Sequence, residues 1–160
     1  MKTKKLKKLG ACREAILYVQ TQKSPTKAWN NCERGDWMLW LAKRMDVDDK
    51  KLTMAKAIIA KQVEHLMKDQ RSKDILQACF DYANGKITRK ELNATYAAYV
   101  AAIYAAYAAD ANAAYATDAV AVATYAADAN AAIISSMKKS ADICKEYLTE
   151  EVLSRYRKLR

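Results

Sequence analysis

Hydrophobic residues recur three and four positions apart along most of the chain, the spacing that places them on one face of an α-helix. Ser24-Pro25 is typical of a helix start, because serine caps the first turn and proline fits the first helical position. Gly35 is expected to end that helix and Asp36 to cap the next one. Thr88 and Glu91 have capping-box spacing and open a further helix. The pattern predicts an all-α bundle of about six to eight helices.

A long alanine-rich segment, residues 94–134, dominates the second half of the chain. It contains no Gly, Pro, Lys, Arg or Glu, and about half of it is alanine, the best intrinsic helix former. Its larger side chains fall on one arc of a helix; they are Tyr96, Val100, Ile103, Tyr104, Tyr107, Tyr115, Val122 and Tyr125. The opposite face is mainly alanine. A helix with no charged face is usually buried, so we expect this one to be central, covered by the chain or by a second protomer.

The length of this segment sets a problem for a compact fold. One straight helix over residues 88–134 is roughly 70 Å long at 1.5 Å per residue. A compact domain of this chain length is only about 40 Å across. The helix must therefore protrude, dimerise or fold back near Thr117-Asp118, and we favour a hairpin. We expect residues 1–10 to be a basic, flexible lead-in and residues 11–160 to be one helical domain, with residues 88–134 as its core helix segment.

The net charge of +10 is unevenly distributed along the chain. Residues 91–137 hold four acidic residues and no basic one, whereas the flanking segments are basic. A basic surface favours an anionic partner such as a nucleotide, a nucleic acid or an acidic protein patch. The alanine-rich segment is weakly hydrophobic and carries three aspartates, so it does not resemble a transmembrane helix and no membrane partner is expected.

Cysteine usage bounds the metal chemistry and the compartment. The four cysteines contain no Cys-x-x-Cys pair and His65 is the only histidine, so we predict no zinc site; they are Cys12, Cys32, Cys79 and Cys144. Their wide spacing, together with a lysine-rich N-terminal segment that no apolar signal core follows, predicts reduced cysteines and a cytoplasmic protein.

All three tryptophans fall within twelve residues, in the segment Ala28 to Leu41. Arg34 and Asp36 lie at the expected N-terminal end of the helix that carries Trp37 and Trp40. A helix N-terminus with an arginine beside it suits an anion, and tryptophan faces stack on bases. The alternative is that the tryptophans attach two helices to the core while the arginine pairs with an acid.

The alanine-rich segment adds two candidates. Tyr107 and Asp118 carry phenol and carboxylate groups that either line a ligand cavity or serve the core and surface ion pairs. The candidate ligand-binding residues are therefore Trp29, Arg34, Asp36, Trp37, Trp40, Tyr107 and Asp118. If a small molecule binds, we expect one pocket lined by the tryptophan segment together with members of the tyrosine row.

The tryptophan segment also carries a resemblance. The motif Ala-Trp-x-x-Cys-x-Arg-Gly-Asp-Trp-Met-Leu-Trp-Leu (28–41), followed by an alanine-rich Tyr/Asp helix and by Cys144, resembles a family of bacterial and phage immunity proteins. The resemblance covers about residues 11–147, although this chain is richer in lysine and poorer in arginine and proline than the usual members. It implies neutralisation of something harmful, without naming the target and without any catalytic residue.

The sequence favours binding over catalysis. With one histidine, no nucleophile motif and no phosphate loop, nothing forms a catalytic set, so we predict a protein that is not an enzyme and needs no cofactor or metal. We expect an immunity or counter-defence protein that sequesters an anionic small molecule, a nucleotide-derived immune signal, in a basic and aromatic pocket. The alternative is an antidote that binds a protein toxin directly. Nucleic-acid binding ranks third, because the charge fits but no recognised module appears. A homo-oligomer stays open.

Overall fold

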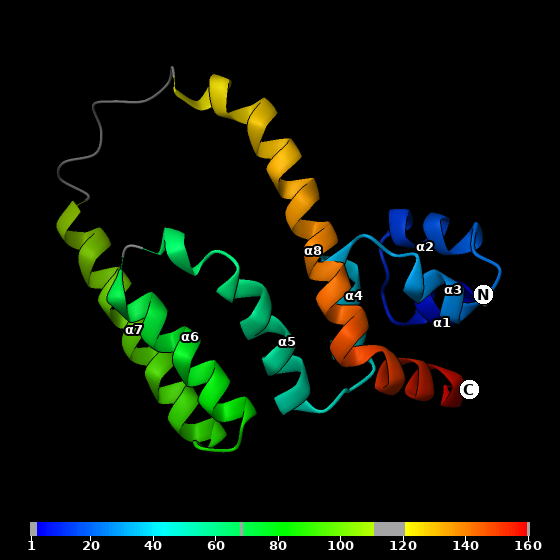
Figure 1. Cartoon of the computed structure of the whole chain (residues 1–160), viewed down its shortest axis with the longest axis horizontal. Helices are drawn as coiled ribbons and strands as arrows, with labels where there is room; N and C mark the ends of the chain where they lie inside the picture. Colours follow the sequence, from blue (N-terminus) through cyan, green and yellow to red (C-terminus); the bar gives the residue numbers. More distant parts are fainter. Residues whose placement is uncertain (1–2, 68, 111–120, 160) are drawn as a thin grey trace. The chain divides into compact units, whose positions relative to one another are not determined.

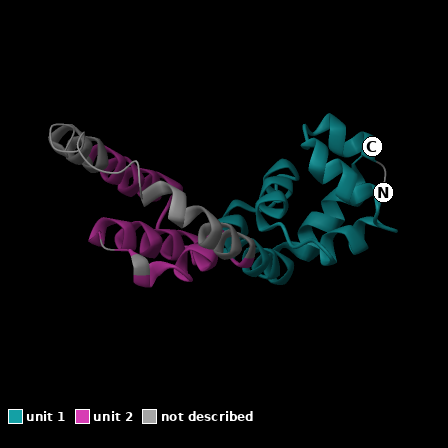
Figure 2. Cartoon of the chain, turned by 90° about the horizontal axis from the view of Figure 1, so that it is seen from above, with its two compact units in different colours: residues 1–55, 136–160 teal, residues 56–135 magenta. Residues whose placement is uncertain are grey.

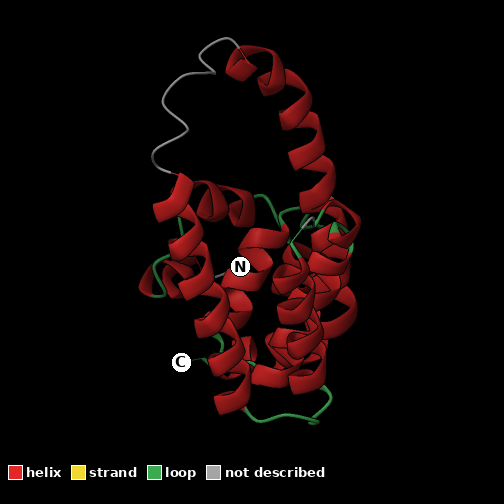
Figure 3. Cartoon of the chain, turned by 90° about the vertical axis from the view of Figure 1, so that its left-hand side faces the viewer, coloured by secondary structure: helices red, strands yellow, loops and turns green. Residues whose placement is uncertain are grey.

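The computed structural model describes residues 3–67, 69–110 and 121–159, without the side chains of residues 66 and 102–134 (Figure 1). Its elements in chain order are α1 (Thr3–Lys8), α2 (Arg13–Gln20), α3 (Pro25–Asn30), α4 (Gly35–Arg44), α5 (Asp49–Lys61), the 3-10 helix η1 (Glu64–Leu66), α6 (Gln70–Ala83), α7 (Arg89–Asp110) and α8 (Ala121–Lys158). These residues contain no strand, as Figure 3 shows, which confirms the predicted all-α class. None of the helices they form is both long and apolar enough to cross a membrane.

Contacts between helices divide the chain into two compact units (Figure 2). Unit 1 comprises residues 1–55 and 136–160, and unit 2 comprises residues 56–135. Helices α5 and α8 each contribute residues to both units. We expected a single domain over residues 11–160, and whether the two units fold as one domain stays a prediction. That expectation came from chain length, which carries no information on how contacts are distributed between helices.

The core of unit 1 is built on the C-terminal half of α8. Four residues of this helix, spaced three or four apart, are at most 1% exposed: Ala141, Cys144, Leu148 and Val152. Met38 on α4 is 2% exposed and is one of the largest fully enclosed side chains in the described part of the chain. The spacing places the four α8 residues along one helix face, so this half of α8 is an amphipathic helix packed against the core.

Gly35 permits α4 to approach α8 closely. A Cβ at this position would clash with the Ser140 side chain and would lie 2.8 Å from the Ser140 carbonyl carbon and 2.9 Å from the Ala141 nitrogen. The prediction that Gly35 ends the preceding helix in a left-handed conformation is wrong, because α3 already ends at Asn30 and Gly35 begins α4 with a φ that is not positive. Arg34, and not Asp36, holds the N-cap position.

The N-terminal segment is a helix instead of the expected flexible lead-in. Leu6 on α1 is 3% exposed, and the Lys5 ammonium donates a hydrogen bond to the Leu159 carbonyl. The first and last described segments of the chain therefore lie side by side in unit 1, as Figures 1 and 2 show. Five lysines in the first eight residues suggest a solvated tail, but burial of a single leucine offsets part of the entropy lost when the segment orders.

At two helix starts, the structure confirms the capping residues that the sequence predicts. The Lys27 amide donates to the Ser24 hydroxyl at 3.1 Å, with Pro25 at the first position of α3. Before α7, the Thr88 amide donates to the Glu91 carboxylate at 2.7 Å and the Glu91 amide donates to the Thr88 hydroxyl at 3.3 Å. This reciprocal pair is the capping box that the spacing of the two residues predicts.

In unit 2, α6 packs against α7, with Leu76, Tyr82 and Leu92 buried. The described parts of the alanine-rich segment belong to α7, up to Asp110, and to α8, from Ala121, and the expected turn near Thr117-Asp118 lies outside the described residues. On the part of α7 whose side chains are described, Tyr96 is 58% exposed and four alanines are exposed: Ala94, Ala97, Ala98 and Ala101. The rest of the described chain does not cover this stretch, which alanine permits because it stabilises a helix by its backbone preference. Cover by a second protomer, the other expectation, stays a prediction.

Candidate functional site

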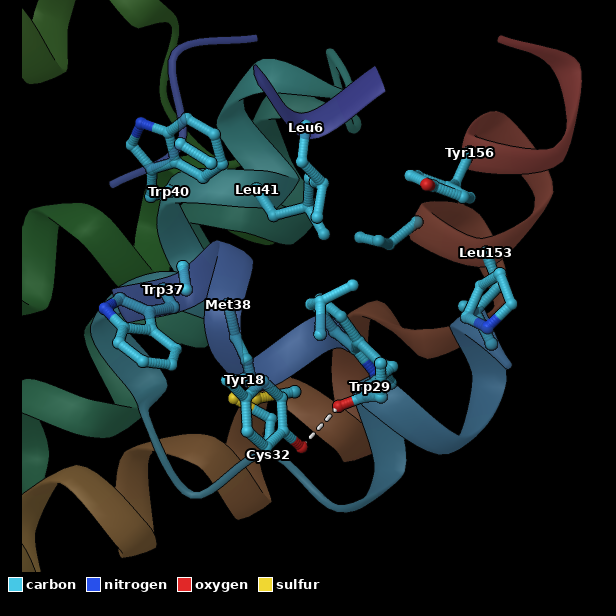
Figure 4. Close-up of a pocket in the computed structure, with 16 residues that line it drawn as sticks. Leu6, Tyr18, Trp29, Cys32, Trp37, Met38, Trp40, Leu41, Leu153 and Tyr156 are labelled. Carbon is cyan, nitrogen blue, oxygen red and sulfur yellow. Dashed lines mark hydrogen bonds between the residues drawn. The ribbon is translucent and has the colours of Figure 1, made fainter. Parts of the chain in front are cut away.

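The three tryptophans line one apolar hollow in unit 1, which we call the tryptophan pocket (Figure 4). It has a volume of about 60 Å³ and receives residues from α1, α2, α3, α4 and α8. Five aromatic residues line it: Tyr18, Trp29, Trp37, Trp40 and Tyr156. Leu6, Met38, Leu41 and Leu153 belong to its aliphatic lining. The sequence segment that carries the tryptophans therefore does form one wall of a pocket, with α1 and α8 adding residues from the chain ends.

The inner wall is held by polar groups that the protein satisfies itself. Trp29 is 4% exposed and its indole nitrogen donates to the Thr149 hydroxyl at 2.7 Å. The Tyr18 hydroxyl donates to the Ala28 carbonyl at 2.8 Å, a bond that Figure 4 marks with a dashed line. Burial raises the pKa of Tyr18 to about 12, so the phenol keeps its proton even above the ordinary value of 10. With these groups paired inward, the wall offers a ligand little beyond apolar surface.

Arg34 pairs with an acid two residues away. Its Nε donates to Asp36 Oδ1 at 2.9 Å and its Nη2 donates to Asp36 Oδ2 at 2.7 Å, a bidentate pair at the start of α4. The Arg34 guanidinium holds the pKa of the Asp36 carboxyl below its ordinary value, and the carboxylate in turn raises the pKa of Arg34. An anion that approaches Arg34 must therefore compete with the carboxylate already bound there.

Three cations stand on faces of the pocket's aromatic rings. Arg34 lies 4.4 Å from the Trp37 ring centroid, Arg44 lies 5.9 Å from that of Trp40, and Lys5 lies 5.6 Å from that of Tyr156. These distances are within the range of cation–π attraction. None of the three cations lines the pocket itself, but each contacts a ring that does, and we call Lys5, Arg34 and Arg44 the basic rim. In the part of the chain that the structure describes, Arg44 forms no ion pair with a carboxylate.

Three residues of the pocket and its basic rim, Lys5, Arg44 and Tyr156, were not among the candidates from the sequence, and the sequence contains a signal for only one of them. Arg44 follows Trp40 by four positions, the spacing that places two residues on the same helix face. Lys5 and Tyr156 are far apart in the sequence, so only the packing of α1 on the end of α8 reveals that contact.

Tyr96, the one tyrosine of the row whose side chain is described, does not line the tryptophan pocket. The Tyr107 side chain and all of Asp118 lie outside the described residues, and Tyr96 and Tyr99 line a different hollow of about 360 Å³ within unit 2. Lys56, Ser72 and Cys79 are among the other residues of this tyrosine hollow. The structure thus brings together Trp29, Trp37 and Trp40, with Arg34 and Asp36 beside them. Tyr96 and Tyr99 line the tyrosine hollow instead, and the expected contribution of Tyr107 and Asp118 to a shared pocket stays a prediction.

Metal and thiol chemistry find little support among these residues. The described residues contain no cluster of three or more His, Cys, Asp or Glu side chains able to hold a metal ion. Cys32 and Cys144 are buried free thiols, and burial raises the pKa of Cys144 to about 12. Such a thiol is neutral and a poor nucleophile at physiological pH, which suits a packing role in the core.

No protein-family model matches the chain, and no curated protein or solved structure matches it either. The resemblance to immunity proteins therefore rests on the motif of residues 28–41 and its sequence context, and it stays a prediction.

Proposed function

We propose that this chain is a non-enzymatic binding protein, of immunity or counter-defence type, that sequesters an anionic small molecule at the tryptophan pocket. One observation carries the proposal: the hollow is apolar and aromatic, and three of its rings each have a cation over one face. Apolar walls bind the body of a ligand, and cations around them orient a negatively charged group. No bond has to be made or broken for such a protein to neutralise a signal.

The size of the pocket defines the part of the ligand that enters it. A volume of about 60 Å³ is well below the roughly 300–1,000 Å³ of pockets that enclose a whole ligand. It suits a short alkyl chain or the edge of one aromatic ring, while the charged remainder stays at the basic rim. The apolar lining favours a buried group without hydrogen-bonding edges. A nucleotide-derived signal would place only part of its base in the pocket and its phosphates on the rim.

Arg44 is the rim residue best suited to bind the anion. Arg34 already holds Asp36, and the Lys5 ammonium already donates to the Leu159 carbonyl. The Arg44 guanidinium lies over Trp40, is exposed, and has no carboxylate partner among the described residues. Stacking on an indole leaves the planar edge of a guanidinium free to form two parallel hydrogen bonds to a carboxylate or phosphate.

The test is thermal melting of the whole protein against a panel of anions. The panel contains mononucleotides, cyclic dinucleotides, ADP-ribose, and carboxylates that carry aromatic or alkyl groups. A ligand at 100 times its dissociation constant stabilises the folded state by about 2.7 kcal/mol, or roughly 5–10 °C for a chain of this size. Arg44→Gln should remove most of the shift, whereas Lys43→Gln, which removes one charge at the exposed neighbouring position, should leave it in place.

A second variant should change anion binding in the opposite direction. Asp36→Asn removes the carboxylate that competes for Arg34, so it should tighten anion binding at the rim while Arg34→Gln weakens it. Equal losses in Arg44→Gln and Lys43→Gln would show that only overall charge matters and would contradict the proposed site. If no anion changes the melting temperature, the proposal fails, and the alternative of an antidote to a protein toxin becomes the hypothesis to test by affinity capture.

A further inference from the structure

The net charge of this protein resides entirely in its first and last residues. Residues 1–13 and 152–160 hold ten basic residues and no acidic one. The 138 residues between them contain 18 basic and 18 acidic residues, so they are neutral as a group. The charge of +10 is therefore not a property of the whole surface but of two short segments at opposite ends of the sequence.

The fold brings these two segments together in unit 1. The Lys5 ammonium on α1 donates to the Leu159 carbonyl and lies 5.6 Å from the Tyr156 ring centroid. Figures 1 and 2 show the start of α1 and the end of α8 next to each other. Two basic segments that each repel the other are thus held in contact by the burial of Leu6 and Tyr156, which are 3% and 5% exposed.

Most of these cations, among those that the structure describes, form no ion pair. Arg155 is paired with Glu151 at 2.9 Å. By contrast, four exposed lysines form no ion pair with any carboxylate of the described residues; they are Lys4, Lys7 and Lys8 on α1 and Lys158 on α8. Lys4, Lys7 and Lys8 are spaced three and four apart and so share one face of α1. We call Lys4, Lys7, Lys8 and Lys158 the terminal lysine surface.

We propose that the terminal lysine surface binds the phosphate backbone of a double-stranded nucleic acid. Like charges held side by side cost free energy in the isolated protein, and a regular row of phosphates relieves that repulsion. Binding through phosphates alone requires no recognition module, because backbone contacts position a protein on a duplex without reading its sequence.

The apolar residues around this surface favour a duplex over a membrane or a single strand. A helix that lies in a membrane interface needs an outward apolar face, but Leu6 of α1 is turned into the core. A single strand is held by bases stacked on exposed aromatic rings, whereas Tyr156 is buried. Two large apolar residues of unit 1 are exposed, Leu17 on α2 and Tyr147 on α8, and neither belongs to α1 or to the end of α8.

The experiment compares two quadruple variants that lose the same charge. The first replaces Lys4, Lys7, Lys8 and Lys158 by glutamine. The second replaces Lys23, Lys27, Lys90 and Lys139 by glutamine; these lysines are also exposed and have no ion pair with a described carboxylate. Fluorescence anisotropy with a labelled DNA duplex of about 20 base pairs measures the dissociation constant of each protein between about 50 and 200 mM salt.

The wild-type protein should bind the duplex with a steep salt dependence. The first variant should bind at least about tenfold more weakly. The slope of log K against log salt should become shallower by about 3 to 4, because each of the four lost phosphate contacts contributes about 0.9 to it. The second variant should change the slope by less than about 1. Equal losses in the two variants would overturn the proposal. So would binding to vesicles of phosphatidylserine and phosphatidylcholine in the absence of duplex binding, because it would assign the surface to a membrane instead.

Thermal melting of all three proteins provides the control for folding. The substituted lysines are exposed, so both variants should melt within a few degrees of the wild type. Neither variant touches Lys5, Arg34 or Arg44, so loss of duplex binding here is independent of the outcome for small anions at the basic rim.

Discussion

The C-terminal half of α8 and the described part of α7 are both helical, yet they differ in what their small residues do. On α8, Ala141 and Cys144 are fully buried and α4 crosses close by at Gly35. On α7, Ala97, Ala98 and Ala101 are exposed. Alanine thus forms a helix in both places, but it marks close packing only where another helix carries a residue without a Cβ. High alanine content predicts helix formation and leaves burial undecided.

The largest expected effect comes from the core face of α8. Leu148→Ala should lower the free energy of unfolding by about 3 kcal/mol, because Leu148 is 0% exposed and truncation leaves a cavity. Tyr96→Ala on α7 is the matched change at a side chain that is 58% exposed and should cost less than about 1 kcal/mol. Urea denaturation followed by circular dichroism measures both. Similar losses would show that the two helix faces are equally covered.

The next effect tests the close approach of α4 and α8. Gly35→Ala should cost about 2 kcal/mol, since the new Cβ meets backbone atoms of Ser140 and Ala141 and one helix has to shift. Glu33→Ala, in the loop just before α4, removes only an exposed ion pair to Lys138 and should change stability by no more than about 0.5 kcal/mol. A stabilised Gly35→Ala protein would contradict the crossing geometry.

A smaller effect should appear at high pH. The pKa of Tyr18 is raised to about 12 by burial, above the ordinary value of 10 that applies when the chain unfolds. The folded state therefore holds this proton more tightly, so its contribution is complete below pH 10 and is lost as the pH rises towards 12. We expect a loss of about 1 kcal/mol, less than two pKa units would give, because solvent reaches the ring. Tyr18→Phe should remove this part of the pH dependence in denaturation curves measured between pH 9 and 11.

The smallest effect is expected on the alanine face of α7. Ala98→Lys should change the free energy of unfolding by less than about 0.5 kcal/mol, because Ala98 is exposed and lysine is also a good helix former. A loss above about 1 kcal/mol, or a change in molecular mass by light scattering, would mean that a second protomer covers this face, as the bare alanine surface first suggested.

The candidate site shows how far sequence reasoning extends. The clustering of Trp29, Trp37 and Trp40 in twelve residues did predict that they meet, because consecutive short helices keep such residues close. The role of Arg34 as an open anion site was not supported, since Asp36 lies within reach of its side chain and binds it. Arg44 could have been found from its spacing to Trp40. The contribution of Lys5 and Tyr156 could not, because nothing local relates two residues so far apart.

The sequence by itself determined the helices and several of their boundaries. Caps such as Ser24 and the Thr88–Glu91 pair act within one turn, so their geometry is contained in a few neighbouring residues. Only the tertiary structure decided that Gly35 serves a helix crossing, that Leu6 anchors a lysine-rich segment, and that this segment lies beside the basic end of α8. Those features depend on which distant surfaces meet, and that choice follows from the summed burial of many side chains instead of from any local pattern.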